Sequence, residues 1–347
     1  MHSAAEHIAG VIGDDAIPFE EFMRLALYGP GGFYSSDEPV HHGAGRRNDF
    51  LTSPEVGPLF AAVVARFLDN HWHRLGKPDP FNVVEHGAGP GTLARGVMAA
   101  NPECAQALHY VAVEVSQRQR SLHPMEVESV IAFPDHIDAH VTIANELLDN
   151  LPFRLYVYDN GWREAWVSVS RDGRFNEVLR SPREDDAELV AKFPTAKLGA
   201  RLPLLRAAGD WLRDAIAHTP GGCVLIFDYA RDYTLDTVSL NWREWLRTYR
   251  GHDRGGHYLL DAGRQDITVD VMIDQLSLVA PPLAVRSQAQ FLQLWGIDEL
   301  VAEGEKYWAE HAARPDLTAM RMRSRSAEAA ALCDPTGLGG FSVIEWG

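Results

Sequence analysis

Cysteine is scarce in this chain of 347 residues. Its three cysteines, Cys104, Cys223 and Cys333, are far apart, odd in number and without the close spacing of a zinc site. A disulfide framework needs paired cysteines, and a structural zinc site needs clustered ligands. We therefore expect neither disulfides nor a metal site, and we expect the protein to work in a reducing compartment.

Long apolar runs are absent as well. No stretch of the sequence approaches the roughly 20 consecutive apolar residues of a membrane-spanning helix. The first arginine is Arg24, and no basic patch followed by an apolar stretch stands near the beginning of the sequence. This pattern argues against a secretory or mitochondrial targeting signal. The sequence therefore predicts no membrane insertion and a cytoplasmic location.

Basic residues are fewer than acidic ones. The chain has 32 lysines and arginines against 48 acidic residues, which gives a net charge of −16. A nucleic-acid partner requires a basic face, so this balance argues against nucleic-acid binding. An acidic surface suits a basic protein substrate. No pattern in the sequence predicts the oligomeric state.

The most informative stretch is residues 82–92, Asn-Val-Val-Glu-His-Gly-Ala-Gly-Pro-Gly-Thr. Asn82 to His86 predicts a short buried strand, and the three glycines after it predict a turn. Leu93 and Val97 then continue at helical spacing. Strand, glycine turn and helix form the first unit of a nucleotide-binding α/β domain.

The spacing of the glycines indicates the kind of nucleotide. A dinucleotide fingerprint has glycine at its first, third and sixth places, and here the sixth place is Thr92. Glu85 stands just before the turn, where its carboxylate would repel a pyrophosphate and suit a cationic or amine-bearing ligand. Glu-x-Gly-x-Gly-x-Gly is typical of class I methyltransferases that use S-adenosyl-L-methionine (SAM). An NAD site and a tight turn without a ligand are the alternatives.

A second acid, Glu114, closes the next predicted strand, Tyr110-Val-Ala-Val. An acid at this place commonly binds the ribose hydroxyls of a nucleotide cofactor. The glycines allow the backbone to approach the ligand more closely than a Cβ atom would permit. We expect SAM to contact residues of these two strand ends: Glu85, Gly87, Ala88, Gly89, Gly91, Glu114 and Val115.

Polar side chains also follow the predicted strand Val141–Ala144. Asn145, Glu146 and Asp149 would reach the carboxyl edge of a parallel sheet, where ligands bind in open α/β folds. Carboxylates can hold a guanidinium through two hydrogen bonds and accept a proton from it. We therefore propose Glu146 and Asp149 as catalytic and Asn145 as a cofactor contact. The alternative is that Asn145 caps a helix and Asp149 stabilises its first turn.

A further carboxylate, Asp228, follows the apolar run Cys223–Phe227, which predicts the fifth core strand. Its position at the strand end would place it beside Glu146, as a second catalytic carboxylate. The alternative is that Asp228 caps backbone groups and packs against Tyr229.

The first 76 residues predict a helical segment that covers the cofactor. A helix over Ile17–Tyr28 ends at Gly29-Pro-Gly-Gly, and a polar loop over His41–Asn48 is expected to act as a lid. Ser53, followed by Pro54, predicts the N-cap of the next helix. Thr52 and Ser53 are also candidates for cofactor contact, and capping alone is the alternative.

The remainder of the chain adds strands to this core. Two turn signals within residues 153–180 predict an antiparallel meander inserted after the fourth strand. Residues 327–332 predict a short helix, and residues 337–346 predict a final antiparallel strand at the end of the sheet. We divide the chain into a helical lid segment (1–76), a core with the meander (77–232), and a substrate-side segment with the last strands (233–347).

Several motifs occur in the order seen in the MidA-type SAM-dependent methyltransferases, and the chain resembles that family over most of its length. The motifs are Leu25-Ala-Leu-Tyr-Gly-Pro-Gly-Gly-Phe-Tyr, Asp49-Phe-Leu-Thr-Ser-Pro-Glu, the glycine turn, Glu114-Val-Ser, Ala144-Asn-Glu-Leu-Leu-Asp-Asn-Leu-Pro, Phe227-Asp-Tyr, Tyr249-Arg-Gly-His, Gln265-Asp-Ile-Thr and Gln290-Phe-Leu-Gln-Leu-Trp-Gly-Ile. The chain departs from the family at His86-Gly-Ala-Gly, where an aliphatic residue and Gly-Pro-Gly are usual. Ala230 also replaces a common glycine.

The resemblance implies a class I SAM-methyltransferase fold: a Rossmann-like α/β sheet with a helical N-terminal lid and an inserted β meander. It also implies methylation of an arginine in a protein substrate, since mitochondrial members methylate a core subunit during complex I assembly. Three alternatives remain open at this point. They are a non-catalytic SAM-binding assembly factor, a methyltransferase for small molecules, and an NAD-dependent oxidoreductase.

Overall fold

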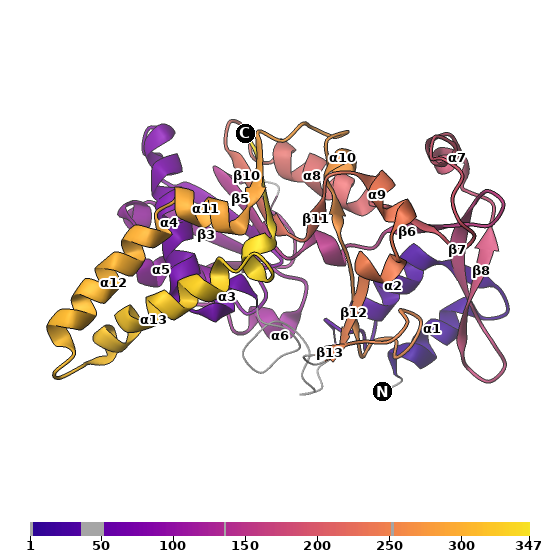
Figure 1. The fold of residues 1–347 in the computed structure, drawn as a ribbon, viewed down its shortest axis with the longest axis horizontal. Coiled ribbons are helices and arrows are strands. Elements are labelled where there is room, and N and C mark those ends of the chain that lie inside the picture. The colour runs from indigo at the N-terminus through magenta and orange to yellow at the C-terminus, as the bar shows by residue number, and fades with distance from the viewer. Residues whose placement is uncertain (1–2, 36–51, 135–136, 251–252) are drawn as a thin grey trace.

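The computed structural model describes residues 3–35, 52–134, 137–250 and 253–347 (Figure 1). The loop His41–Asn48, which the sequence predicts to be a lid, lies outside the described residues. Within the described ranges, no helix combines the length and the apolar character needed to cross a membrane.

A seven-stranded sheet forms the core. Its strands, in spatial order, are β16 (Ala284–Ser287), β17 (Ser342–Trp346), β10 (Cys223–Asp228), β5 (Val141–Asn145), β2 (Phe81–His86), β3 (Leu108–Val113) and β4 (Glu128–Val130). The five strands from β10 to β4 are parallel; β17 pairs antiparallel with β10, and β16 pairs antiparallel with β17. The expected α/β sheet and the antiparallel last strand are confirmed. The last strand does not stand at the sheet's end, however, because β16 pairs with its outer edge.

The order of these strands creates a crevice beside β2. From β2 the sheet continues through β3 and β4 on one side and through β5 and β10 on the other. Helices that leave two neighbouring strands in opposite directions open a crevice at the carboxyl ends of those strands, where ligands bind. The glycine turn after β2 and the polar residues after β5 therefore meet at this point.

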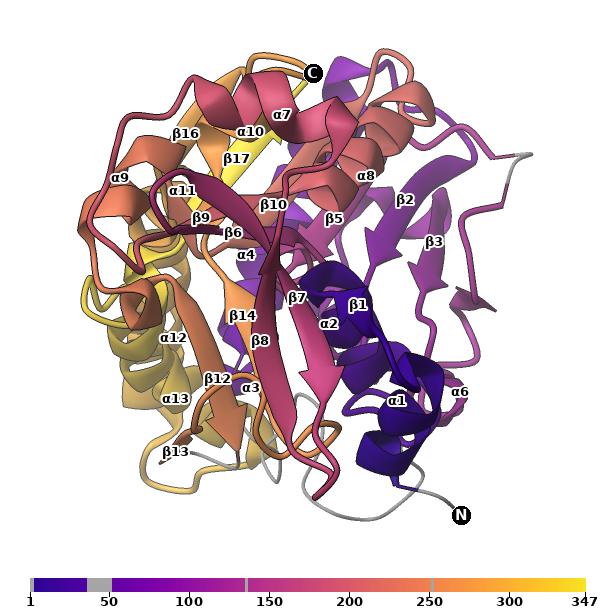
Figure 2. The same ribbon diagram turned by 90° about the vertical axis from the view of Figure 1, so that its right-hand side faces the viewer.

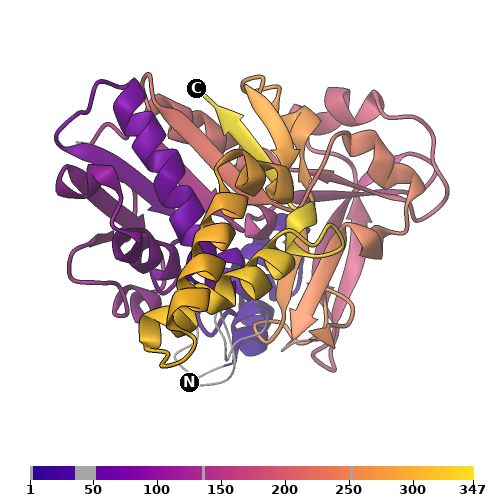
Figure 3. The same ribbon diagram turned by 60° about the vertical axis from the view of Figure 1, so that its left-hand side comes forward.

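Helices cover both faces of the sheet because alternate strand residues point to opposite sides. Val83, Ile143 and Leu225 pack with one group of helices, and Ala144 and Ile226 pack with the other. Figure 3 shows the first group in purple and orange in front of the sheet. It comprises α4 (Pro58–Arg74), α5 (Thr92–Ala100), α11 (Gln288–Leu294), α12 (Ile297–His311) and α13 (Leu317–Leu332); the second comprises α8 (Arg206–Ala217) and α10 (Ile273–Leu276).

Helix α13 is longer than the sequence predicts. The predicted helix over residues 327–332 is only its last part, since the helix begins at Leu317. The Asp316 side chain caps its first turn by accepting a hydrogen bond from the Ala319 N–H at 2.7 Å. With α12 it forms an antiparallel hairpin at one side of the molecule (Figure 1).

The predicted meander is confirmed and forms a second sheet. Its strands are β6 (Arg154–Tyr158), β7 (Trp162–Val169) and β8 (Phe175–Arg180), joined by β9 (Arg201–Leu204) and β1 (Ala16–Pro18). Asn160 and Gly173 supply the left-handed turn conformations at φ 53° and φ 79°. Figure 2 shows α1 (Ala4–Ile12), β1 and α2 (Phe19–Tyr28) beside this sheet, so the N-terminal residues pack on the meander.

Smaller elements connect the two sheets. The segment after β10 contains β11 (Ala230–Arg231), α9 (Thr234–Ser239), β12 (Leu246–Arg250), β13 (Asp253–Arg254), β14 (Asp266–Val269) and β15 (Val271–Met272). The remaining helices are α3 (Ser53–Val56), α6 (Gln117–Arg120) and α7 (Glu184–Ala191), with 3₁₀ turns η1 (Glu103–Gln106), η2 (Leu148–Asn150), η3 (Trp242–Glu244) and η4 (Leu338–Gly340).

Candidate active site

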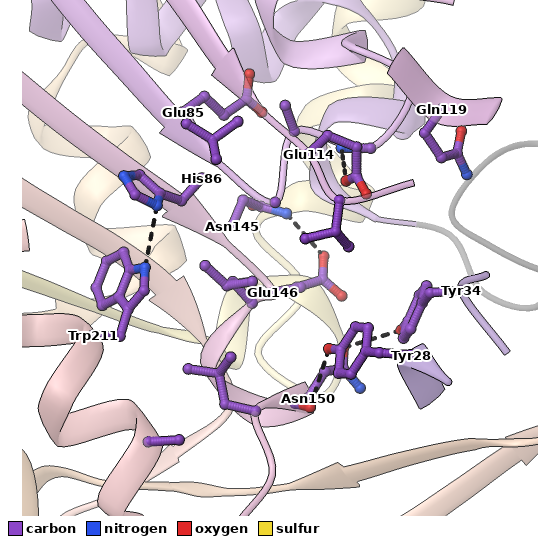
Figure 4. A pocket seen from close by; sticks show the side chains of 18 of the residues that line it. Tyr28, Tyr34, Glu85, His86, Glu114, Gln119, Asn145, Glu146, Asn150 and Trp211 are labelled. Carbon is purple, nitrogen blue, oxygen red and sulfur yellow. Dashed lines mark hydrogen bonds between the residues drawn. The ribbon is translucent and has the colours of Figure 1, made fainter. Parts of the chain in front are cut away.

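A cavity of about 900 Å³ lies at the carboxyl ends of β2, β3 and β5 (Figure 4). Most of the predicted site residues line it: Thr52, Glu85, Gly87, Ala88, Gly89, Glu114, Val115, Asn145 and Glu146. Four other predicted residues, Ser53, Gly91, Asp149 and Asp228, do not line it. Four separate stretches of the chain thus supply one cavity, and three of them follow strand ends, as expected from the strand order.

The glycine turn forms one wall of the cavity through backbone that only glycine adopts readily. Gly87 and Gly89 have φ values of 68° and 52°, in the left-handed region. A Cβ atom at Gly87 would also stand 3.0 Å from the Leu147 Cδ1 atom. Gly91 serves a different purpose, because it caps helix α5 and packs against His123 and Pro124.

Glu114 ties this turn to the end of β3. Its Oε2 atom accepts a hydrogen bond from the Gly89 N–H at 3.0 Å, and its Oε1 atom accepts one from the Ser116 N–H at 2.7 Å. Burial raises the pKa of the carboxyl, and these backbone hydrogen bonds oppose that rise. Because a carboxylate has about four lone-pair sites, Glu114 can still accept hydrogen bonds from a ligand in the cavity.

Glu85 is a nearly buried acid that accepts a hydrogen bond from a tyrosine. The Tyr110 hydroxyl donates to its Oε2 atom at 2.8 Å, and the side chain is 4% exposed. Burial raises the pKa of Glu85 to about 8. A positively charged ligand in the cavity would favour the ionised form and lower this pKa.

Glu146 enters the cavity from the loop after β5. Its φ of 51° places a non-glycine residue in the left-handed region, which is uncommon and is often found at functional sites. The Glu146 N–H donates to the Phe227 carbonyl at 2.8 Å, and the Asn145 side-chain amide donates to the Glu146 carboxylate at 3.3 Å. Burial, together with the Asp149 carboxylate, raises the pKa of Glu146 to about 8.

Asp228 and Asp149 lie behind the wall of the cavity. Asp228 accepts hydrogen bonds from three backbone N–H groups, those of Leu148 at 2.9 Å, Asp149 at 3.3 Å and Tyr229 at 2.9 Å. Burial raises the pKa of Asp228 to about 8, and burial and the Asp228 carboxylate raise the pKa of Asp149. These contacts match the alternative reading of Asp228 as a cap of the loop that carries Glu146.

The structure corrects the predicted N-cap of helix α3 by one residue. Thr52 is the N-cap, and its N–H donates to the Glu55 carboxylate at 3.4 Å in a capping box. The box requires an acid three residues after the cap, which selects Thr52 and not Ser53. The Ser53 hydroxyl instead donates to the Gln288 side chain at 2.8 Å. Thr52 lines the cavity.

Two tyrosines that the sequence analysis did not select form an aromatic wall. The rings of Tyr28 and Tyr34 stack with centroids 5.6 Å apart and planes inclined by 18°. The Tyr28 hydroxyl donates to the Asn150 carbonyl at 3.2 Å, and the Tyr34 hydroxyl lies 3.1 Å from both the Asn150 amide oxygen and Asp266. Figure 4 shows both rings on the side toward which Glu146 points. The sequence signal that could have identified these tyrosines is the motif Leu25–Tyr34, to which both belong.

His86 belongs to a second aromatic group at the other end of the cavity. The Trp211 indole N–H donates to its Nδ1 atom at 3.3 Å, and the Phe133 ring stacks on it at 5.7 Å. Burial lowers the pKa of His86 to about 4, so the ring is neutral near pH 7 and a weak base. Because Nδ1 accepts, Nε2 carries the proton, and that atom is buried without a hydrogen-bond partner among the residues that the structure describes. Sequence reasoning missed Trp211, which is 125 residues away on α8.

Acidic side chains outnumber basic ones in the described lining of the cavity. Its two arginines, Arg24 and Arg183, are already paired, with Glu21 at 2.6 Å and Glu164 at 2.7 Å. Among the described residues, the central acids Glu85, Glu114 and Glu146 form no ion pair. The cavity therefore favours a ligand that brings positive charge.

These features fit SAM. Its sulfonium and ammonium groups match the unpaired acids, and the left-handed glycines leave room beside the backbone. The Asn145 Oδ1 atom and the His86 Nε2 atom are a buried acceptor and a buried donor without partners in the described part of the chain, as a polar ligand would require. Glu85, the glycine turn, Glu114 and Asn145 would hold the cofactor, which supplies an activated methyl group when bound.

Comparisons with known proteins identify the family of this chain. A family model of S-adenosyl-L-methionine-dependent methyltransferases matches residues 63–286. The mitochondrial protein arginine methyltransferase NDUFAF7 homolog of Drosophila melanogaster is 28% identical over 303 residues, which cover 76% of this chain and 66% of that protein. The mitochondrial protein arginine methyltransferase NDUFAF7 of Mus musculus is 27% identical over 81% of this chain and 71% of its own length.

Two crystal structures from Burkholderia thailandensis are similar to the whole chain. One, bound to S-adenosyl-homocysteine (SAH), has a TM-score of 0.81 and 27% sequence identity, and the match covers 99% of this chain and 91% of that chain. The other, a native crystal structure, has a TM-score of 0.80 and 27% sequence identity, and the match covers 99% of this chain and 90% of that chain. The fold and the cofactor expected from the sequence are therefore confirmed.

Proposed function

Because this chain belongs to the MidA-type family of S-adenosyl-L-methionine-dependent methyltransferases, we propose that it methylates an arginine side chain of a protein. The observation that carries this proposal is the environment of Glu146. This carboxylate reaches the cavity from a left-handed backbone position and has no cationic partner among the described residues. A guanidinium group is a ligand of matching charge and shape.

The aromatic wall supports the same acceptor. A guanidinium is planar and weakly hydrated, and it stacks on aromatic rings while donating hydrogen bonds in its plane. Tyr28 and Tyr34 present such rings next to Glu146 (Figure 4). A cationic side chain can therefore contact aromatic surface and a carboxylate at once.

Glu146 would also accept the proton that the guanidinium group loses during methyl transfer. Methyl transfer forms a nitrogen–carbon bond as the sulfur–carbon bond breaks, and the guanidinium nitrogen loses one proton. A bound guanidinium favours the ionised carboxylate, so substrate binding lowers the pKa of Glu146 from about 8. The carboxylate then holds the guanidinium charge away from the attacking nitrogen and accepts the released proton. The catalytic roles that the sequence predicts for Asp149 and Asp228 stay predictions, since both residues lie behind the cavity wall.

The substrate protein is a separate part of the proposal. The relatives described above are named protein arginine methyltransferases. The resemblance to the MidA-type family makes a subunit of respiratory complex I the first candidate. The cytoplasmic location predicted from the sequence remains a prediction, and cell fractionation with an antibody against this chain tests it.

Labelling identifies the acceptor. Lysate from a strain that lacks the gene is incubated with the purified enzyme and radiolabelled SAM, and labelled proteins are digested and analysed by mass spectrometry. We expect a labelled protein that contains methylarginine. A labelled metabolite without any labelled protein would contradict the proposal, and methyl-lysine as the only labelled residue would contradict the arginine assignment.

A further inference from the structure

A second hollow of about 1370 Å³ lies beside the active-site cavity. Helix α13 forms one side of it, and the N-terminal part of α4, with α3, α5 and α6, forms the other. We name it the α13 groove. Its α13 side includes Thr318, Arg321, Met322 and Arg325, whose spacing of three and four residues places them on one face of the helix.

The α13 groove is basic, although the chain has a net charge of −16. Among the described residues, four arginines line it: Arg95, Arg118, Arg321 and Arg325. One of them, Arg325, also lies 3.4 Å from the Glu303 carboxylate, which is outside the lining. Its two acids, Glu55 and Glu328, are buried and serve the fold. Glu328 accepts hydrogen bonds from the Leu59 N–H at 2.9 Å and the Ser324 hydroxyl at 2.6 Å. The groove therefore presents positive charge to an occupant.

Apolar side chains accompany these arginines. Val56, Leu122 and Met322 line the α13 groove, and Leu122 is 54% exposed. Elsewhere on α13, outside the groove lining, Leu317 is 79% exposed and Met320 is 50% exposed. No acidic residue occurs from Leu317 to Ala327. Mixed arginine and apolar surface is typical of a protein–protein interface.

The α13 groove adjoins the active-site cavity. The two hollows share part of their lining: Pro54, Glu55, Pro90, Thr92 and Gln119. The Glu55 carboxylate is close enough to Glu146 to contribute to its raised pKa. A polypeptide that lies in the groove can therefore extend a side chain toward the cavity.

We propose that the α13 groove binds an acidic, partly apolar segment of the substrate protein. This inference rests on the proposed function, because it assumes a protein acceptor. The cavity selects a cationic side chain, and the groove selects carboxylates on neighbouring residues. Together they distinguish an arginine that is followed or preceded by acidic residues from other arginines. A nucleic acid does not fit this surface, because its phosphates would meet the acids of the adjoining cavity.

Peptide binding tests the groove directly. The probes are fluorescein-labelled (Glu-Leu-Ala)₅ and (Lys-Leu-Ala)₅, measured by fluorescence anisotropy with the full chain. The groove variant carries Arg118→Glu and Arg321→Glu. The matched control carries Arg314→Glu and Arg323→Glu, which change the net charge equally on the α12–α13 hairpin outside the groove lining.

We expect the wild type to bind the acidic peptide and not the basic one. The groove variant should bind the acidic peptide at least about tenfold more weakly, because two attractive charges become repulsive, and the control should change by less than about twofold. All proteins should bind SAH equally and melt at the same temperature. Absence of binding by the wild type, or equal loss in both variants, would overturn the inference. Tighter binding of a 15-nucleotide oligothymidine or of anionic vesicles, with the same sensitivity to the groove variant, would also overturn it.

The labelling experiment separates this inference from the proposed function. If no protein is labelled, the proposed function fails, while peptide binding still decides whether the groove is an acidic-segment site. If a protein is labelled and the groove variant keeps the wild-type KM for it, the groove inference fails and the proposed function stands. A KM raised about tenfold with unchanged kcat supports both.

Discussion

Glu146 and Asp228 stand at the ends of neighbouring strands, and the chain uses them differently. Asn145 of β5 and Phe227 of β10 pair in register, so the two acids that follow them are close together. Burial raises the pKa of each to about 8. Asp228, however, accepts hydrogen bonds from three backbone N–H groups, whereas Glu146 lines the cavity and is held by the Asn145 amide.

This difference shows that a raised pKa does not by itself mark a catalytic carboxylate. Desolvation raises the pKa of a buried acid whether the acid supports a loop or awaits a ligand. Position and hydrogen-bond partners together distinguish the two cases. Asp228 does not line the cavity and accepts three backbone N–H groups, whereas Glu146 lines the cavity. Asp228 holds the loop, and the loop presents Glu146.

The replacement Glu146→Gln should have the largest effect on activity. The amide keeps the size of the side chain but neither accepts the proton nor balances the guanidinium charge, so kcat should fall by about 100- to 10,000-fold. SAH affinity by calorimetry and the melting temperature should stay at wild-type values. A variant that methylates the substrate at the normal rate would remove Glu146 from the reaction.

The pH dependence of kcat/KM tests the same role of Glu146. The Glu146 carboxyl is ionised only above its pKa, which burial raises to about 8 in the protein without substrate. At saturating SAM, kcat/KM should therefore rise with pH toward 8, by up to about tenfold per pH unit below the apparent pKa. The cofactor's positive charge can shift that pKa downward. The Glu146→Gln variant should lack this rise of kcat/KM with pH. A wild-type kcat/KM that stays constant from pH 6 to 9 would contradict the prediction.

The replacement Asp228→Asn should chiefly reduce stability. The amide nitrogen cannot accept the hydrogen bonds of the backbone N–H groups, and an unsatisfied buried N–H costs about 1–3 kcal/mol. Urea unfolding should show a loss of that size, with residual methylation at temperatures where the variant is folded. A stable Asp228→Asn variant with the activity loss expected of Glu146→Gln would reverse the comparison and make Asp228 catalytic.

Tyr34→Phe should have the smallest effect. It removes a hydroxyl that lies 3.1 Å from both Asn150 and Asp266 but keeps the ring, so stability should fall by about 1 kcal/mol. The KM for the protein substrate should change by less than about fivefold, because the aromatic face remains. Tyr34→Ala is the comparison, and it should raise KM more than Tyr34→Phe does. Equal KM values for both variants would show that the ring does not contact the acceptor.

The parts of the site that depend on local sequence could be predicted. The glycine turn and Glu85 lie within eleven consecutive residues, and strand ends were enough to select Glu114, Asn145 and Glu146. Parallel strands place their carboxyl ends at one edge, so these separate stretches had to converge. The N-cap at Thr52 was missed by one residue because two hydroxyl residues stand side by side, and only the acid three positions later distinguishes them.

The residues that reach the site from distant elements were decided by the tertiary structure. Trp211 meets His86 across the crevice, and Tyr28 and Tyr34 reach Asn150, more than a hundred residues further along the chain. The sequence by itself determined which strands end in acids and which turn lacks Cβ atoms, because those properties belong to neighbouring residues. Packing alone decided which acid lies behind the cavity wall and which lines the cavity, since the Leu148 and Asp149 N–H groups reach Asp228 from a distant part of the chain and several elements build the cavity.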